Sequence, residues 1–313
     1  MKLTFYYLIK PFLPRYIQIL LRQLIAKRKR SHYQHIWPID PDAGNIPENW
    51  SGWPNGKKFA LVLSHDVDTQ KGFDAIPNLL DIEKKMGFKS TFNIVPERYR
   101  VSQDTIELIK QEGFGVSVHG LKHDGKLFKS KKIFDERAIK INEYLKQWGS
   151  NGFTSPSMIS NLDWQHDLNI AHSICTFDTD PFEPKPTPSK TIFPLVITNE
   201  DTGCSYVELP YTLPQDHTLF IILKEADISI WKKKLKWIAE KGGMALLNTH
   251  PDYIQFDDKR CSYELYPKSF YVDFLQHITT EYGGQFWNAL PSDVSHFWRS
   301  ERKEDQQGCI KSY

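Results

Sequence analysis

The chain has 313 residues, of which 40% are hydrophobic and 25% charged, a composition typical of a soluble globular protein rather than a disordered chain. Its length fits one large α/β domain or two ordinary ones. The formal net charge of +2, with no basic stripe interleaved with aromatic residues, argues against a nucleic-acid partner.

Residues 1–30 are apolar but interrupted by basic residues and two prolines, so they do not form a good membrane span. Between Arg15 and Ile25 the apolar residues can share one face of a helix, and a Lys-Arg-Lys-Arg run follows at 27–30. Such a helix can lie on an anionic membrane or pack against the protein body, and the sequence leaves both open. Proline-rich residues 37–58 predict a linker or cover segment, so 1–58 precede the main domain.

The expected compartment follows from the cysteines and the N-terminal stretch. The four cysteines lie far apart without a C-x-x-C pair, so they predict neither a disulfide framework nor a zinc knuckle. No small-residue cleavage site of a signal peptide follows the N-terminal apolar stretch. We therefore expect a cytoplasmic protein, associated with the inner face of a membrane if residues 1–30 bind lipid.

Residues 59–300 alternate short apolar runs with amphipathic stretches, and 301–313 predict a flexible tail. Strands are predicted at 59–64, 90–95, 115–118, 152–154, 206–209, 219–223, 244–248 and 285–289, and helices at 75–86, 103–112, 133–148, 228–241, 266–282 and after Pro291. Residues 178–194 contain five prolines and predict a long irregular loop, of the kind that is usually functional. The alternation predicts a parallel sheet with helical crossovers, either open or closed into a barrel.

Polar side chains follow four of these strands where each strand ends. They are Asp66 and Asp68, His119 and His123, Ser155, and His250. In parallel α/β folds, active sites assemble at the carboxyl end of the sheet. Two histidines and one carboxylate with an open position form the ligand set of many catalytic zinc sites. The sequence therefore predicts a metal site with an attached base at this end of the sheet.

In this order the motifs resemble those of the polysaccharide deacetylase family with the NodB-homology domain, carbohydrate esterase family 4 in its broad sense, over about residues 59–290. The resemblance implies a distorted (β/α) barrel with about seven strands. It implies that Asp66 is the catalytic base and His250 the catalytic acid. Asp68, His119 and His123 would hold one divalent metal, zinc first, with cobalt, manganese or nickel as alternatives. His65 and Asp124 are then only neighbours of these residues.

The chain departs from the family pattern at its third motif. The family motif normally reads Arg-Pro-Pro or Arg-Ser-Pro, and this chain has Thr154-Ser155-Pro156 in its place. No arginine is therefore available at position 154 to hold Asp66. The residue that would tune His250 is not identified. Pro156, Tyr211 and the 178–194 loop are the candidates for contacts with the substrate.

The resemblance implies a metal-dependent hydrolase that removes an N- or O-linked acetyl group from a carbohydrate, such as a surface-polysaccharide or lipid-linked glycan precursor. Two alternatives on the same fold stay open: a cyclic-amide hydrolase of the allantoinase type, and a catalytically weakened carbohydrate-binding protein. An iron oxygenase shares the ligand set but usually has a jelly-roll fold, against which the alternating helices argue. The sugar and the oligomeric state are not predicted.

Overall fold

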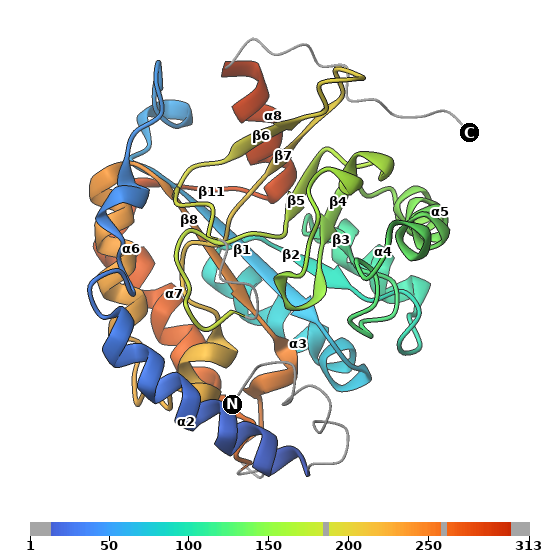
Figure 1. The fold of residues 1–313 in the computed structure, drawn as a ribbon. Coiled ribbons are helices and arrows are strands. Elements are labelled where there is room, and N and C mark those ends of the chain that lie inside the picture. The colour runs from blue at the N-terminus through green and yellow to red at the C-terminus, as the bar shows by residue number, and fades with distance from the viewer. Residues whose placement is uncertain (1–13, 184–187, 258–261, 302–313) are drawn as a thin grey trace.

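The nine-residue strand β1 (Phe59–Val67) lies at the centre of the sheet and is buried along its whole length. Its apolar run is continuous because both faces of a parallel sheet are covered. It pairs in parallel with β2 (Ser90–Ile94), β8 (Met244–Thr249) and β11 (Phe286–Asn288). This computed structural model describes residues 14–183, 188–257 and 262–301 (Figure 1).

From β2 the sheet continues in parallel through β3 (Gly115–His119), β4 (Gly152–Thr154), β5 (His172–Ile174) and β7 (Ser205–Glu208). The short strand β6 (Leu195–Thr198) runs antiparallel to β7 at the edge. A single parallel bridge between Leu213 and Leu247 connects the segment after β7 to β8. Among the described residues, the seven parallel strands β1–β5, β7 and β8 thus curl into the predicted distorted (β/α) barrel, and β11 extends it.

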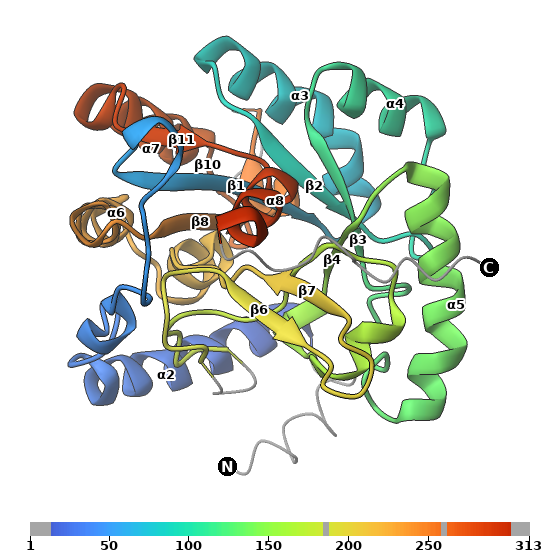
Figure 2. The same cartoon turned by 90° about the horizontal axis from the view of Figure 1, so that it is seen from above.

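Helices surround the strands, as the view from above shows (Figure 2). They are α3 (Gln70–Met86), α4 (Gln103–Gln111), α5 (Lys131–Trp148), α6 (Ser229–Lys241) and α7 (Lys268–Tyr282), and α8 (Pro291–Glu301) lies over the middle of the strands in that view. Each turns an apolar face inward; in α5, Phe134, Ile141 and Leu145 share the buried face at helical spacing. Gly87, with a φ of 77°, ends α3 in the left-handed conformation that glycine adopts without strain.

The N-terminal helix α2 (Arg15–Tyr33) lies below the ends of β1 and β8 in the view of Figure 1. Ile19 and Ala26 are its buried residues. A proline-rich segment then leads back to β1 and contains 3₁₀ turns at Pro41–Gly44 and Pro54–Gly56. Further 3₁₀ turns lie at Pro156–Met158, Trp164–Asp167 and Pro251–Tyr253, and β9 (Ile254–Gln255) pairs with β10 (Tyr266–Pro267).

One predicted strand is wrong, and four strands were not predicted: β5, β6 and the two-residue strands β9 and β10. Residues 219–223 do not form a strand, because His217–Ile222 form a π-helix that is buried on all sides. A short apolar run without polar positions has no periodicity that separates a buried helix from a buried strand. The strands β5 and β6 were missed because three or four residues carry too little pattern.

The cysteines also differ from expectation. Cys175 is a buried free thiol, whereas Cys204, in the turn between β6 and β7, is disulfide-bonded. The sequence predicted no disulfide framework and a reducing compartment, and the disulfide at Cys204 does not fit the second expectation. Disulfides persist mainly in oxidising compartments, so the disulfide at Cys204 counts against the expected cytoplasmic location. That location stays an untested prediction.

Candidate metal centre and acid–base site

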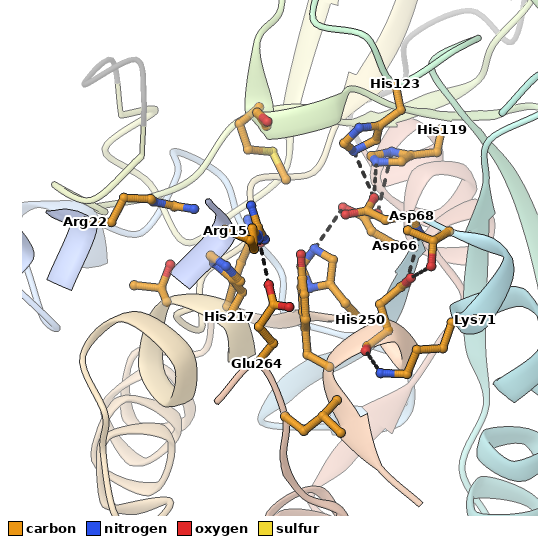
Figure 3. Close-up of a pocket in the computed structure, with 18 of the residues that line it drawn as sticks. Arg15, Arg22, Asp66, Asp68, Lys71, His119, His123, His217, His250 and Glu264 are labelled. Atoms are coloured by element: carbon orange, nitrogen blue, oxygen red, sulfur yellow. Dashed lines mark hydrogen bonds and ion pairs between the residues drawn. The ribbon is translucent and has the colours of Figure 1, made fainter. Parts of the chain in front are cut away.

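A cavity of about 750 Å³ opens at the carboxyl ends of the central strands. Asp66 and Asp68 reach it from the end of β1, His119 from the end of β3, and His250 from just beyond β8 (Figure 3). The cavity therefore brings together the predicted base, acid and metal-ligand candidates. Residues far apart in the chain meet there because parallel strands end at one edge of the sheet.

Asp68, His119 and His123 can hold a metal ion. Each offers one ligand atom, and these atoms lie within 4.8 Å of one another. Asp68 Oδ1 is 2.9 Å from His123 Nε2 and 3.5 Å from His119 Nε2. This buried carboxylate oxygen faces the two imidazole nitrogens, as expected for an atom placed to bind a cation together with them. Two imidazole nitrogens and one carboxylate oxygen suit zinc with an open position for water.

Neighbouring side chains fix the ionisation and orientation of these ligands. Burial opposes ionisation of Asp68, but the charge and hydrogen bonds of His123 and His119 outweigh it and hold the pKa of Asp68 well below its ordinary value. His119 Nδ1 lies 2.6 Å from the hydroxyl of Thr154, which leaves Nε2 facing Asp68. Such partners of ligating histidines set the ring orientation and the metal affinity. Thr154 therefore contacts His119, a candidate metal ligand, rather than Asp66.

Two amides hold the carboxylate of Asp66. Asn93 Nδ2 donates to Asp66 Oδ1, and Asn248 Nδ2 donates to Asp66 Oδ2, both at 2.7 Å. Asn93 lies directly opposite Asp66 on β2, and Asn248 comes from β8 on the other side of β1. Both asparagines are fully buried, so water does not compete for these bonds. Two neutral donors thus orient Asp66 in a chain that has no arginine at position 154.

His250 is paired with Asp216, a residue that the sequence reasoning missed. His250 Nδ1 lies 2.7 Å from Asp216 Oδ1, and Tyr266 donates its hydroxyl to Asp216 Oδ2 at 3.0 Å. Burial lowers the pKa of His250, but the charge and hydrogen bond of Asp216 outweigh it and raise that pKa to about 10. His250 Nε2 is 4.0 Å from Asp66 Oδ2. His250 Nε2 therefore faces Asp66 in the cavity, and the raised pKa favours the protonated imidazole.

Asp252 supports the chain where β1 ends. Its carboxylate accepts hydrogen bonds from the Asp68 backbone N–H at 2.9 Å and from the Thr69 hydroxyl. Lys71 donates to the Asp252 carbonyl at 2.6 Å. A Cβ on Gly72 would lie 2.2 Å from Asp252 Oδ2, so only glycine allows this close approach. The loop that carries Asp68 is thus fixed from the side opposite the histidines.

The two remaining substrate-contact candidates lie near the cavity but do not line it. Pro156 is buried against Gly120, and it lines a smaller space beside His123. Tyr211 is buried, and its hydroxyl lies within hydrogen-bond distance of Asp180 Oδ2, at 3.0 Å, and of Glu183 Oε1, at 2.9 Å. From the 178–194 loop, Phe182 and Glu183 reach the cavity wall; residues 184–187 lie outside the described part of the chain.

Three other polar residues singled out in the sequence are placed away from the reaction centre. His65 is buried in a network with Glu83 and Thr249, both at 2.8 Å, because it alternates with Asp66 along β1 and points to the other face. The carboxylate of Asp124 forms two bonds of 2.7 Å with Arg137. Ser155 is buried and donates to the Ile159 carbonyl.

No family model matches the sequence, and no curated protein matches it. Solved structures do resemble it. A protein from Mycobacterium smegmatis assigned as a polysaccharide deacetylase superposes with a TM-score of 0.62 at 17% identity, covering 82% of this chain and 96% of its own. A protein from Pseudomonas aeruginosa PAO1 with the same assignment superposes with a TM-score of 0.61 at 15% identity, covering 82% of this chain and 95% of its own. The allantoinase PuuE superposes with a TM-score of 0.62 at 14% identity, covering 84% of this chain and 98% of its own. At these identities the likeness shows the fold, and this chain has the NodB-like (β/α) barrel of polysaccharide deacetylases and of PuuE.

Proposed function

We propose that the protein is a metal-dependent hydrolase that removes an acetyl group from a carbohydrate. The observation that carries this proposal is the placement of Asp66 and the His250–Asp216 pair beside the Asp68–His119–His123 group in one cavity. A binding protein has no need of a base and a protonated acid that face each other beside three metal ligands.

Each group has one task in the hydrolysis of an N-acetyl group. Asp68, His119 and His123 would hold a divalent metal, which would supply Lewis-acid activation of the water and of the acyl carbonyl. Asp66, oriented by its two amides, accepts a proton from the attacking water. His250 donates a proton to the departing nitrogen as the C–N bond breaks, so the products are acetate and a free amine. General acid catalysis of this kind contributes about 10²- to 10⁴-fold.

An assay of acetate release tests this function. The substrates are N- and O-acetylated sugars, measured with zinc, cobalt, manganese or nickel and after chelation. We expect chelation to abolish acetate release and His250→Ala to lower it by about 10²- to 10⁴-fold. His296→Ala, which alters an exposed histidine on α8, is the matched control and should retain full activity. Release that survives both chelation and His250→Ala would refute the mechanism.

The same assay separates the two alternatives on this fold. A cyclic amide, added in parallel and followed by loss of the ring, tests the allantoinase-like reaction that the similarity to PuuE raises. A weakened carbohydrate-binding protein would bind glycans without turnover of any substrate. Turnover of acetylated sugars, with the cyclic amide left intact, is the result expected here.

For the setting of the substrate, we propose a lipid-linked or surface-glycan precursor at the cytoplasmic face of a membrane. The supporting observation is the outward face of α2, where Tyr16, Leu20 and Leu24 follow one another at one-turn spacing with exposed fractions of 58%, 51% and 55%. Lys27 and Arg28 are exposed on the following turn. None of the described helices is long and apolar enough to cross a bilayer. Surface contact through an apolar stripe flanked by basic residues fits this helix.

Flotation with liposomes tests the membrane contact. The full chain should float with vesicles that contain an anionic lipid, and the double variant Leu20→Ser, Leu24→Ser should remain at the bottom. Vesicles of neutral lipid should capture less protein, because the basic residues lose their counter-charge. Equal recovery of wild type and variant on anionic vesicles would remove α2 from the proposal.

A further inference from the structure

The outer wall of the cavity carries two arginines from the N-terminal helix. Arg15 and Arg22 line the cavity from α2, on the side opposite His119 and His123 (Figure 3). They lie two turns apart on the inward face of the helix, whereas the exposed Leu20 and Leu24 lie on the outward face. One helix thus presents apolar side chains to the surroundings and guanidinium groups to the site.

The position of α2 is fixed by contacts that do not involve Arg22. Gln23 donates to the Ile221 carbonyl at 2.9 Å, and Lys29 donates to the Pro181 carbonyl at 2.7 Å. Arg30 forms an ion pair with Glu225. These bonds join both halves of the helix to the π-helix region and to the loop after β5. Arg22 therefore stays at the cavity without being needed to hold the helix.

Arg22 has no hydrogen bond or ion pair with any residue in the described part of the chain, although it is only partly exposed. Glu183 also lines the cavity, but its carboxyl has Tyr211 and Gln215 as hydrogen-bond partners. Burial, followed by the charge of Asp180, raises the pKa of Glu183 to about 8, which favours its neutral form. Arg15 is paired with Glu264 at 2.6 Å. The guanidinium of Arg22 is thus left free to bind an anion.

We propose that Arg22, assisted by Arg15, binds an oxyanion of the substrate, so that the sugar deacetylated here carries a phosphate or a carboxylate. This inference rests on the proposed function and narrows its substrate class. A guanidinium suits both groups because its N–H donors match two oxygens of either. A cavity of about 750 Å³ has room for a sugar together with such a substituent.

The test compares three N-acetylated probes that differ in charge. N-acetylglucosamine 1-phosphate carries a phosphate, N-acetylmuramic acid carries a carboxylate, and methyl N-acetylglucosaminide is neutral. For the metal-loaded enzyme, kcat/KM should be higher for at least one anionic probe than for the neutral one. In Arg22→Gln, loss of a charge-assisted bond should lower the ratio of kcat/KM for the anionic probe to kcat/KM for the neutral probe by about 10- to 100-fold. Arg28→Gln, on the exposed side of the same helix, is the matched control and should leave the ratio unchanged.

A preference for the phosphate probe alone identifies a phosphorylated sugar, and a preference for the carboxylate probe alone identifies an acidic sugar. Equal kcat/KM for all three probes, or a ratio that survives Arg22→Gln, overturns the inference.

Calorimetric titration with N-acetylglucosamine 1-phosphate supplies a readout that needs no turnover. Binding should weaken by about 10-fold or more in Arg22→Gln and not in Arg28→Gln. Contact of the phosphate with the metal alone would be insensitive to Arg22 and would count against the inference. If no acetate is released from any probe but binding still depends on Arg22, the proposed function fails and the anion site stands.

Discussion

The inner floor and the outer wall of the cavity are built in different ways. On the floor, Asp66, His119 and His250 are buried, and each is held by a hydrogen bond from another part of the barrel. On the wall, Arg15 and Arg22 come from a helix at the surface, and Arg22 has no partner among the described residues. The fixed distances of the floor suit the proposed chemistry, and the wall suits the proposed recognition of an anion.

This difference has an energetic reason. A buried carboxylate or imidazole loses its hydration, so it must be hydrogen-bonded or paired in the folded protein. A partly exposed guanidinium stays hydrated, so it needs no partner in the protein before a ligand binds. Substitutions on the floor should therefore change metal binding or turnover, and substitutions on the wall should change the choice of substrate.

Removing a metal ligand should have the largest effect. Asp68→Asn keeps the size of the side chain but removes the charge, so we expect loss of stoichiometric zinc and of acetate release. Zinc content by mass spectrometry and calorimetric titration measure the first, and the acetate assay measures the second. The same loss in Asp124→Asn, which alters a surface carboxylate paired with Arg137, would show that the effect is not specific to the floor.

Removing the partner of His250 should change the pH profile. The carboxylate of Asp216 stabilises protonated His250, whose pKa is raised to about 10, so His250 in Asp216→Asn should lose its proton at lower pH. The alkaline limb of kcat/KM should move down by about one to three pH units. Rates from pH 6 to pH 11 with saturating zinc measure this shift. An alkaline limb at the wild-type pH would remove Asp216 from this role.

Removing one amide from the base should have a smaller effect. Asn248→Ala and Asn93→Ala each delete one hydrogen bond to Asp66, so we expect kcat to fall by about 10- to 100-fold in each. The zinc affinity should stay near that of the wild type, because neither asparagine contacts the ligand group. A parallel loss of zinc affinity and kcat would indicate general disruption of the floor. Thermal melting of both variants shows whether each is folded.

Much of the floor could be predicted from the sequence. Continuous apolar runs predicted the buried strands, and polar residues directly after them predicted a site at one edge of the sheet. The Asp-x-Asp and His-x-x-x-His spacings place their side chains by local geometry alone. For this reason the ligand candidates Asp68, His119 and His123 could be identified before the structure was known.

The partners of these residues depend on how distant strands align, which no local pattern contains. Thr154 was expected to leave Asp66 without a partner, but it contacts His119 instead, and Asn93 and Asn248 hold the base from both neighbouring strands. Asp216 was missed because its segment was interpreted as part of a region of short strands, whereas it precedes a π-helix.

The sequence by itself determined the alternation of strands and helices, the end of the sheet that carries the site, and the residue types of the metal group. Local periodicity and spacing encode all three. Only the tertiary structure decided which amides hold Asp66, which carboxylate faces His250, and which side of α2 faces the cavity. These contacts join segments far apart in the chain, 182 residues apart for Asp66 and Asn248, so they exist only once the barrel has brought its strands into register.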